Sequence, residues 1–292
     1  MRFVILILIS SFSILLAQNN IDNGYTKIAA DKKYGEFIWF HSDSMNKDFP
    51  CLVFLPTDYK NNKKEYPVVY MLHGYNNSPF TEEGIRSMNN SATGILEAAN
   101  EFQVIIVCPL VGNKYYINSP IFKEQKYASL IGTELVQMID NKYRTKKDRN
   151  ARILAGFSMG GYGAVSLLCR YPEVFSTAIS RGGALDAQSL MDDLNWDDIS
   201  LEILGDYWQN QKQYHLHSIV NLLNKIQNRN DVSIVLEVGR EDFLYTGNKK
   251  VEAKLRTTKI PYIFAEYPGG HIWSKNALQS MLTHLQYFNK TK

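Results

Sequence analysis

The sequence predicts a three-layer α/β protein with a mainly parallel central sheet, and three observations carry that prediction. Short apolar runs without alternating polarity recur along the chain, as in strands that helices cover on both faces. Segments with apolar residues at helical spacing separate these runs. Proline or glycine closes several of the runs. Because the alternation continues without an internal repeat or a linker, we expect residues 18–292 to form a single domain.

The first half of the chain opens with two expected strands that flank a polar turn at residues 42–47. This pattern is typical of an antiparallel start at the edge of a mixed sheet. Pro56 ends the second strand, and Pro67 opens a strongly apolar strand that stops at His73. The elements expected up to residue 143 are strands at 37–40, 51–55, 68–72 and 104–108 and helices at 94–100 and 128–143.

The second half continues the alternation from a strand at 153–156, which passes at once into a helix that ends before Pro172. Residues 184–231 carry acidic and aromatic side chains in a looser pattern. This segment either includes a cap over the site or forms ordinary crossover helices that pack against the sheet. The remaining expected elements are strands at 176–180, 232–238 and 262–267 and helices at 249–257 and 274–288.

Composition narrows the class of partner. The chain has 292 residues, of which 45% are hydrophobic and 21% charged, and a formal net charge of +3. Such a small charge, without an arginine-rich stripe, does not indicate nucleic acid as a partner. The three cysteines lie in apolar segments and permit at most one bridge, so we expect buried thiols. No Cys-x-x-Cys or His-x-x-x-His spacing indicates a metal, and no cofactor is expected.

The N-terminus reads as a secretory signal peptide over residues 1–17. Arg2 precedes an apolar run from Phe3 to Leu16, after which the chain turns polar. The run is short for a membrane span of ~20 residues, although an uncleaved anchor is the alternative. Position 18 is Gln18, where a bacterial lipoprotein would carry its lipid-bearing cysteine. We therefore expect a secreted or periplasmic protein without stable membrane association after cleavage.

A Gly-x-Ser-x-Gly motif places Ser158 between Gly156 and Gly160. The motif alone is weak evidence, because glycine and serine are common residues. Here an apolar strand precedes it and a helix follows, which is the setting of a nucleophile elbow. In such an elbow the hydroxyl is exposed at the top of the sheet. The alternative is a tight packing turn whose serine merely caps the helix.

A nucleophilic serine needs a base and an acid that orients the base. The expected chain order on this kind of sheet is serine, then acid, then histidine. His271 follows the last expected strand through a Pro-Gly-Gly turn, whereas His284 falls in the middle of a helix and is expected to be a surface or packing residue. Asp242, in the loop after the preceding strand, is the favoured acid, with the adjacent Glu241 as the alternative.

The reaction would also place negative charge on a carbonyl oxygen, which needs preorganised N–H donors. One donor is expected from Met159, the residue after the nucleophile. The second is expected from the loop that follows an earlier strand, with the N–H of Tyr75 as the candidate. In that loop His73 would be structural, its imidazole tied into the turn.

Four motifs follow one another along the chain: Leu72-His-Gly74, the elbow Gly156-Phe-Ser-Met-Gly-Gly-Tyr-Gly163, Gly239-x-x-Asp242-Phe-Leu, and Pro268-Gly-Gly-His271-x-Trp273. Together they resemble the esterase family that includes esterase D, tributyrin-type acyl esterases, feruloyl and acetylxylan esterases and the mycolyltransferases. The resemblance implies an α/β-hydrolase fold with Ser158, Asp242 and His271 as the catalytic triad. An exported location fits the polysaccharide-deacylating or acyl-transferring branches rather than the cytosolic S-formylglutathione hydrolases.

The expected function is therefore that of an exported serine carboxylesterase. It would hydrolyse short-chain or aryl acyl esters on carbohydrate through an acyl-enzyme, so its partner is a small-molecule or polysaccharide ester. One alternative is a mycolyltransferase-type acyltransferase, in which a sugar hydroxyl replaces water. A non-catalytic binding module on a hydrolase fold is a more remote alternative. Candidate substrate contacts in the loops at the strand ends are Tyr75, Tyr115, Tyr116 and Trp273.

Overall fold

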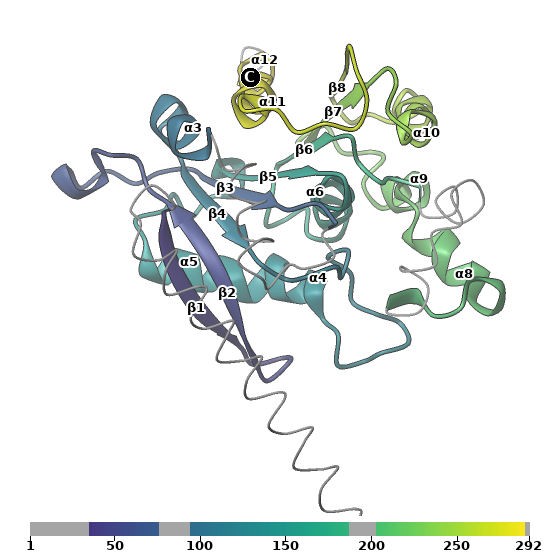
Figure 1. The fold of residues 1–292 in the computed structure, drawn as a ribbon, viewed down its shortest axis with the longest axis horizontal. Helices are drawn as coiled ribbons and strands as arrows, with labels where there is room; N and C mark the ends of the chain where they lie inside the picture. Colours follow the sequence, from purple (N-terminus) through teal and green to yellow (C-terminus); the bar gives the residue numbers. More distant parts are fainter. Residues whose placement is uncertain (1–34, 76–93, 187–202, 290–292) are drawn as a thin grey trace, which may run out of the picture.

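A computed structural model describes residues 35–75, 94–186 and 203–289, which fold around an eight-stranded sheet (Figure 1). The expected signal peptide lies outside the described residues. Each of the eight expected strands is present, and the strand order is β1-β2-β4-β3-β5-β6-β7-β8. The strands are β1 (Glu36–Ser42), β2 (Lys47–Phe54), β3 (Val68–Leu72), β4 (Ile105–Pro109), β5 (Arg152–Phe157), β6 (Thr177–Arg181), β7 (Ser233–Gly239) and β8 (Tyr262–Tyr267).

Strand direction follows the expected mixed pattern. The pairs β1–β2 and β2–β4 are antiparallel, and the strands from β4 through β8 all pair in parallel. The antiparallel hairpin therefore stands at one edge, as the sequence predicted. Because the parallel strands share one direction, their carboxyl ends meet at a single edge of the sheet, where α/β proteins bind ligands.

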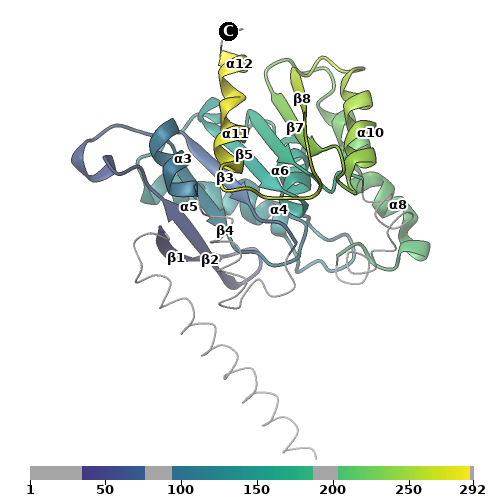
Figure 2. The ribbon, with the colours of Figure 1, turned by 45° about the horizontal axis from the view of Figure 1, so that its top comes forward.

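Helices cover both faces of the sheet, which gives the three expected layers (Figure 2). On one face α3 and α11 pack on a core that includes Val69, Ile106 and Val235. On the other face α6 and α10 pack on the larger core around Tyr70 and Leu154. The α-helices are α3 (Ile95–Phe102), α4 (Tyr127–Ser129), α5 (Val136–Lys142), α6 (Met159–Arg170), α8 (Tyr207–His217), α9 (Ile219–Leu222), α10 (Tyr245–Leu255), α11 (Ala277–Thr283) and α12 (Leu285–Asn289).

Two expected helices are interrupted in the structure. The helix expected at 128–143 contains a π-helical stretch at Leu130–Leu135 between α4 and α5, where the Tyr171 ring packs directly on Gly132. The helix expected at 274–288 is divided into α11 and α12, with His284 between them. Periodicity of apolar residues could not reveal either break, because both interrupted helices keep their buried faces.

The segment 184–231 is described only in part, since residues 187–202 lie outside the described range. Of the rest, α9 packs against α6, and the Tyr162 hydroxyl donates a hydrogen bond to the His217 carbonyl at 2.8 Å. This part therefore contributes helices that pack on α6, which itself covers the sheet. Whether the segment also forms a cap stays an open prediction. Within the described residues, no helix combines the length and apolar character that a membrane span needs.

The cysteines behave as the sequence predicted. Cys51, Cys108 and Cys169 are free thiols, and all three are buried. Burial raises the pKa of Cys108 and of Cys169 to about 12, so neither thiol ionises near neutral pH. These side chains act as small apolar groups in the core.

A buried ion pair joins the carboxyl halves of two central strands. Arg181 of β6 and Glu237 of β7 are direct cross-strand neighbours, and the Arg181 guanidinium donates to the Glu237 carboxylate at 2.6 Å. The other carboxylate oxygen accepts a 2.8 Å hydrogen bond from Nε2 of His284. His284 therefore ties the junction of α11 and α12 to the sheet. Of the two expected roles, surface or packing residue, the structure supports packing and adds the hydrogen bond to Glu237.

We predict that Glu237→Ala lowers the free energy of unfolding by about 3–5 kcal/mol, because Arg181 would stay buried without a countercharge. The matched control is Glu173→Ala, since Glu173 pairs with Arg229 but its side chain is 76% exposed. That substitution should lower the free energy of unfolding by only about 0–1 kcal/mol. Urea unfolding of both variants measures the difference, and equal losses would contradict the role of the buried pair.

Candidate active site

Residues of the proposed chemistry come together at the carboxyl edge of the parallel strands. His73 follows β3, Ser158 follows β5 and Gly182 follows β6. Asp242 lies three residues beyond β7, and His271 lies four residues beyond β8. Residues that are far apart in the sequence thus meet at one edge because strand order and direction bring them there.

Ser158 occupies a sharp turn between β5 and α6. Its backbone angles are φ 57° and ψ −119°, a conformation that residues with a side chain rarely adopt. The helix α6 begins at the next residue, Met159. A strained serine between a strand and a helix is the geometry of a nucleophile elbow. The plain capping alternative does not fit, because the Ser158 side chain makes no capping hydrogen bond to α6.

The two motif glycines are required by close packing. A Cβ atom on Gly156 would lie 2.2 Å from the carbonyl oxygen of Gly160, and a Cβ atom on Gly160 would lie 2.0 Å from the Leu72 carbonyl oxygen. Neither position has room for a side chain. The motif therefore reflects how tightly α6 begins against β3 and β5.

His271 and Asp242 form a hydrogen-bonded pair beside this turn. His271 donates from Nδ1 to Oδ2 of Asp242 at 2.9 Å, and the Asp242 side chain is 0% exposed. The other carboxylate oxygen, Oδ1, accepts the backbone N–H of Leu244 at 2.9 Å. Glu241, the alternative acid, is exposed to solvent. The geometry therefore favours Asp242 as the partner of the imidazole.

Two phenylalanines that the sequence analysis did not single out lie against the same imidazole. The Phe157 ring stacks on His271 with centroids 4.6 Å apart, and the Phe243 ring lies 4.7 Å away at 53°. Phe157 directly precedes Ser158, and Phe243 directly follows Asp242. The sequence could have indicated both phenylalanines, because each lies next to a motif residue in the chain.

The loop after β3 lies against Ser158. A Cβ atom on Gly74 would be 3.3 Å from the Ser158 Cβ, so the Gly74–Tyr75 backbone runs close to the serine. His73 donates from Nδ1 to the Gly74 carbonyl at 2.8 Å, and its Nε2 accepts the Val111 N–H at 3.4 Å. Burial lowers the pKa of His73, which favours the neutral ring. His73 is thus tied into the loop, as the sequence predicted.

Tyr115 and Tyr116 correct an expectation. Both were expected to contact substrate, but both side chains are buried. They have positive φ angles of 51° and 56°, and the Tyr116 hydroxyl donates to the His73 carbonyl at 3.0 Å. Their aromatic rings are needed in the core beneath the His73 loop, which composition alone could not reveal. Trp273 packs against Phe157, with centroids 5.6 Å apart.

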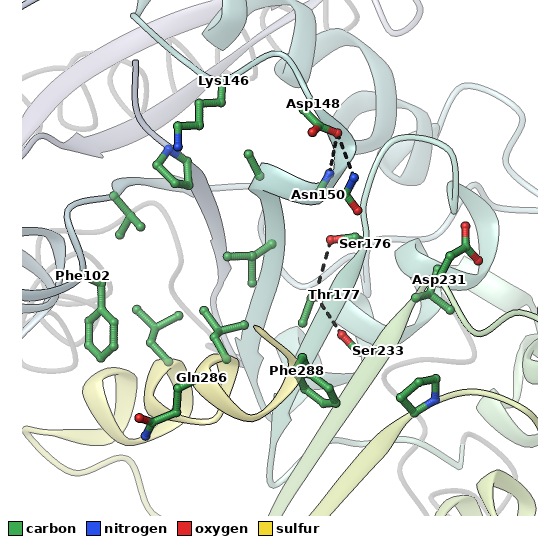
Figure 3. Close-up of a pocket in the computed structure, with 18 of the residues that line it drawn as sticks. Phe102, Lys146, Asp148, Asn150, Ser176, Thr177, Asp231, Ser233, Gln286 and Phe288 are labelled. Carbon is green, nitrogen blue, oxygen red and sulfur yellow. Dashed lines mark hydrogen bonds between the residues drawn. The ribbon is translucent and has the colours of Figure 1, made fainter. Parts of the chain in front are cut away.

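The described residues also line a hollow of about 820 Å³ at the opposite edge of the sheet (Figure 3). Residues at the amino ends of the parallel strands form it, with Phe102 and Phe288 from the covering helices. Thr177 stands between Ser176 and Ser233 in a short chain of hydroxyl contacts (Figure 3). Ser158, Asp242 and His271 do not line this hollow. Although it is large, this hollow is therefore separate from the candidate active site.

The described residues contain no group of three or more histidine, cysteine or acidic side chains arranged to hold a metal ion. What the carboxyl edge offers instead is a serine on a helix N-terminus, a histidine–carboxylate pair and nearby backbone N–H groups. This arrangement is suited to acyl transfer through a covalent intermediate.

Comparison with known proteins gives consistent relatives. The chain is 25% identical over 249 residues to Esterase MT1326 of Mycobacterium tuberculosis (strain CDC 1551 / Oshkosh), covering 76% of this chain and 52% of that protein. It thus spans about half the length of that relative. An acetyl esterase of Caldicellulosiruptor saccharolyticus is 25% identical over 258 residues, covering 80% of this chain and 90% of the relative.

A solved structure of a ferulic acid esterase is similar in three dimensions, with a TM-score of 0.62 and 25% sequence identity. The likeness covers 84% of this chain and 94% of that one. It agrees with the sheet order and the strand–serine–helix turn, which are those of the α/β-hydrolase fold. The sequence model of the family described as "Putative esterase" matches residues 42–285. The chain therefore belongs to this esterase family.

Proposed function

We propose that this protein is an exported serine carboxylesterase that hydrolyses short-chain or aryl acyl esters on carbohydrate. The observation that carries the proposal is the hydrogen bond between His271 and buried Asp242 beside the strained Ser158 turn. A serine hydroxyl alone is a weak nucleophile at neutral pH. A histidine oriented by a carboxylate next to it supplies the missing base.

In the proposed mechanism Asp242 holds the Nδ1 proton of His271, which leaves Nε2 to accept the proton of the Ser158 hydroxyl. The serine oxygen bonds to the acyl carbon as the carbonyl becomes an oxyanion. When the bond to the alcohol oxygen breaks, His271 returns the proton to the departing alcohol. Water, activated by the same histidine, then releases the acid from Ser158.

The oxyanion would be held by the backbone N–H groups of Met159 and Tyr75. Met159 is the first residue of α6, whose N-terminal N–H groups and dipole favour negative charge. Tyr75 belongs to the loop that the His73 imidazole and the Tyr116 hydroxyl hold against Ser158. These contacts support the proposal that both donors are held in place before substrate arrives, which is the requirement for preorganised stabilisation.

The substrate class rests on three lines of support. One relative is named an acetyl esterase, and a similar structure is that of a ferulic acid esterase. Residues 1–17 have the pattern of a signal peptide, which would place the enzyme where esterified glycans occur. Tyr75 and Trp273 remain candidate contacts, since both side chains are partly exposed.

We predict that Ser158→Ala lowers kcat/KM for acetyl esters by about 10⁴-fold or more, because no other group can form the acyl-enzyme. The variant should unfold like the wild type, since the hydroxyl makes no capping bond to α6. Labelling with a fluorophosphonate probe gives a second measurement, with modification of the wild type alone. Comparable turnover in both proteins would rule out Ser158 as the nucleophile.

Asp242→Asn should lower kcat by about 10⁴-fold, because the NH₂ group of the amide can donate to Nδ1 and so favour the wrong tautomer of His271, and the neutral amide cannot stabilise the imidazolium. Glu241→Gln is the matched control, since Glu241 is the adjacent acid and is exposed. We expect this substitution to lower kcat less than about tenfold, because Glu241 is a surface carboxylate outside the hydrogen-bonded pair of His271 and Asp242. Steady-state kinetics on one acetyl ester measures both variants, and the opposite ranking would transfer the role to Glu241.

The proposed substrate class predicts a higher kcat/KM for acetylated or feruloylated xylo-oligosaccharides than for emulsified long-chain triacylglycerol. An interfacial lipase needs a broad apolar surface for docking on oil. The acidic side chains between residues 192 and 208 argue against such a surface, although residues 192–202 lie outside the described range. A preference for the triacylglycerol would show that the carbohydrate assignment is wrong.

A further inference from the structure

Two exposed apolar side chains flank the histidine of the candidate site. Phe243 follows Asp242 in the chain and is 49% exposed, and Ile272 follows His271 and is 50% exposed. The Phe243 ring centroid lies 4.7 Å from that of the imidazole. Large apolar groups gain from leaving water, so an exposed ring beside a reactive histidine has apolar surface available for a ligand.

The chemistry of the site determines which part of the substrate reaches this ring. His271 must give a proton to the alcohol oxygen as the ester bond breaks, so that oxygen has to come within about 3 Å of the imidazole nitrogen. The carbon atoms next to the oxygen then lie close to the imidazole, within reach of an exposed ring that contacts it. The acyl group, by contrast, stays attached to Ser158. An exposed ring beside His271 is therefore placed to contact the alcohol.

Phe157 differs from Phe243 although it also touches the imidazole. Phe157 is part of β5, and its ring packs against both His271 and Trp273. Phe157 is only partly exposed, and both of these aromatic contacts come from the segment that leads into α11. Phe243 belongs to the loop beyond β7 and keeps half of its surface exposed.

We propose that Phe243, together with Ile272 next to His271 in the chain, forms the alcohol-side wall of the active site and selects esters whose alcohol has a flat apolar face. A pyranose ring presents such a face through its C–H groups, and an aryl alcohol presents one through its ring. This inference rests on the proposed function and names the residue that recognises the alcohol. Ring stacking of this kind changes binding by about three- to tenfold.

Three acetyl esters that share one acyl group test the assignment: an acetylated methyl xyloside, phenyl acetate and ethyl acetate. We expect Phe243→Leu to lower kcat/KM about three- to tenfold for the esters of ring alcohols and less than about twofold for ethyl acetate. Leucine keeps an apolar side chain but removes the flat ring. The xyloside and phenyl acetate distinguish a sugar from an aryl alcohol. Phe243→Tyr, which keeps the ring, should retain the wild-type preference.

The rate of deacylation is the second measurement, because the acetyl-enzyme is the same for all three esters. It should be unchanged in Phe243→Leu, since the alcohol has already departed. Phe157→Leu is the matched control, because it removes the other ring that touches His271. That substitution should slow both the hydrolysis of all three esters and the deacylation step.

The proposal would be overturned if Phe243→Leu lowered kcat/KM equally for all three esters and also slowed deacylation, because the ring would then act through His271 alone. The absence of any loss would overturn it as well. Failure of the proposed function gives a different result, in which the wild type itself hydrolyses none of the three esters.

Discussion

The strained backbone of Ser158 is the constraint around which the carboxyl edge of the sheet is built. A positive φ at a residue with a side chain costs of order 1–3 kcal/mol and persists only where its surroundings enforce it. Here the Ser158 N–H donates to the Arg181 carbonyl at 3.0 Å, and the Ser158 carbonyl accepts the N–H groups of Tyr162 and Ala184, both at 3.1 Å. The turn is therefore fastened to β6, to α6 and to the loop after β6.

Arg181 links this turn to the histidine and its carboxylate. Its backbone holds Ser158, while its side chain pairs with Glu237, which lies five residues before Asp242. The guanidinium also stacks on Tyr267, which lies four residues before His271. One buried residue thus contacts the three strands that precede Ser158, Asp242 and His271, the proposed nucleophile, acid and base. Displacing it would disturb all three positions, in addition to its effect on stability.

The sequence predicted the strands, the layers and the candidate catalytic residues because each depends on a local pattern. Apolar runs identify buried strands, and Gly-x-Ser-x-Gly identifies the turn from its own neighbours. Chain order then selected His271 and favoured Asp242.

Properties that depend on side chains distant in the sequence could not be predicted in this way. Tyr115 and Tyr116 look like loop residues in the sequence, yet they are buried beneath the His73 loop. His284 looks like an ordinary helix residue, yet it reaches Glu237 in a strand 47 positions away. The contacts of Phe157 and Phe243 with His271 likewise require the assembled sheet edge.

The candidate site separates the residues that fix its geometry from those that we propose to meet the substrate. Arg181 and Glu237 are buried between strands, so changing them alters the positions of the acid and the base. Phe243 and Ile272 adjoin Asp242 and His271 in the chain, but their side chains extend to the surface. A substitution at an exposed position leaves strand register and the buried ion pair intact. Under this proposal, selectivity for the alcohol can change on this fold without loss of the site's geometry.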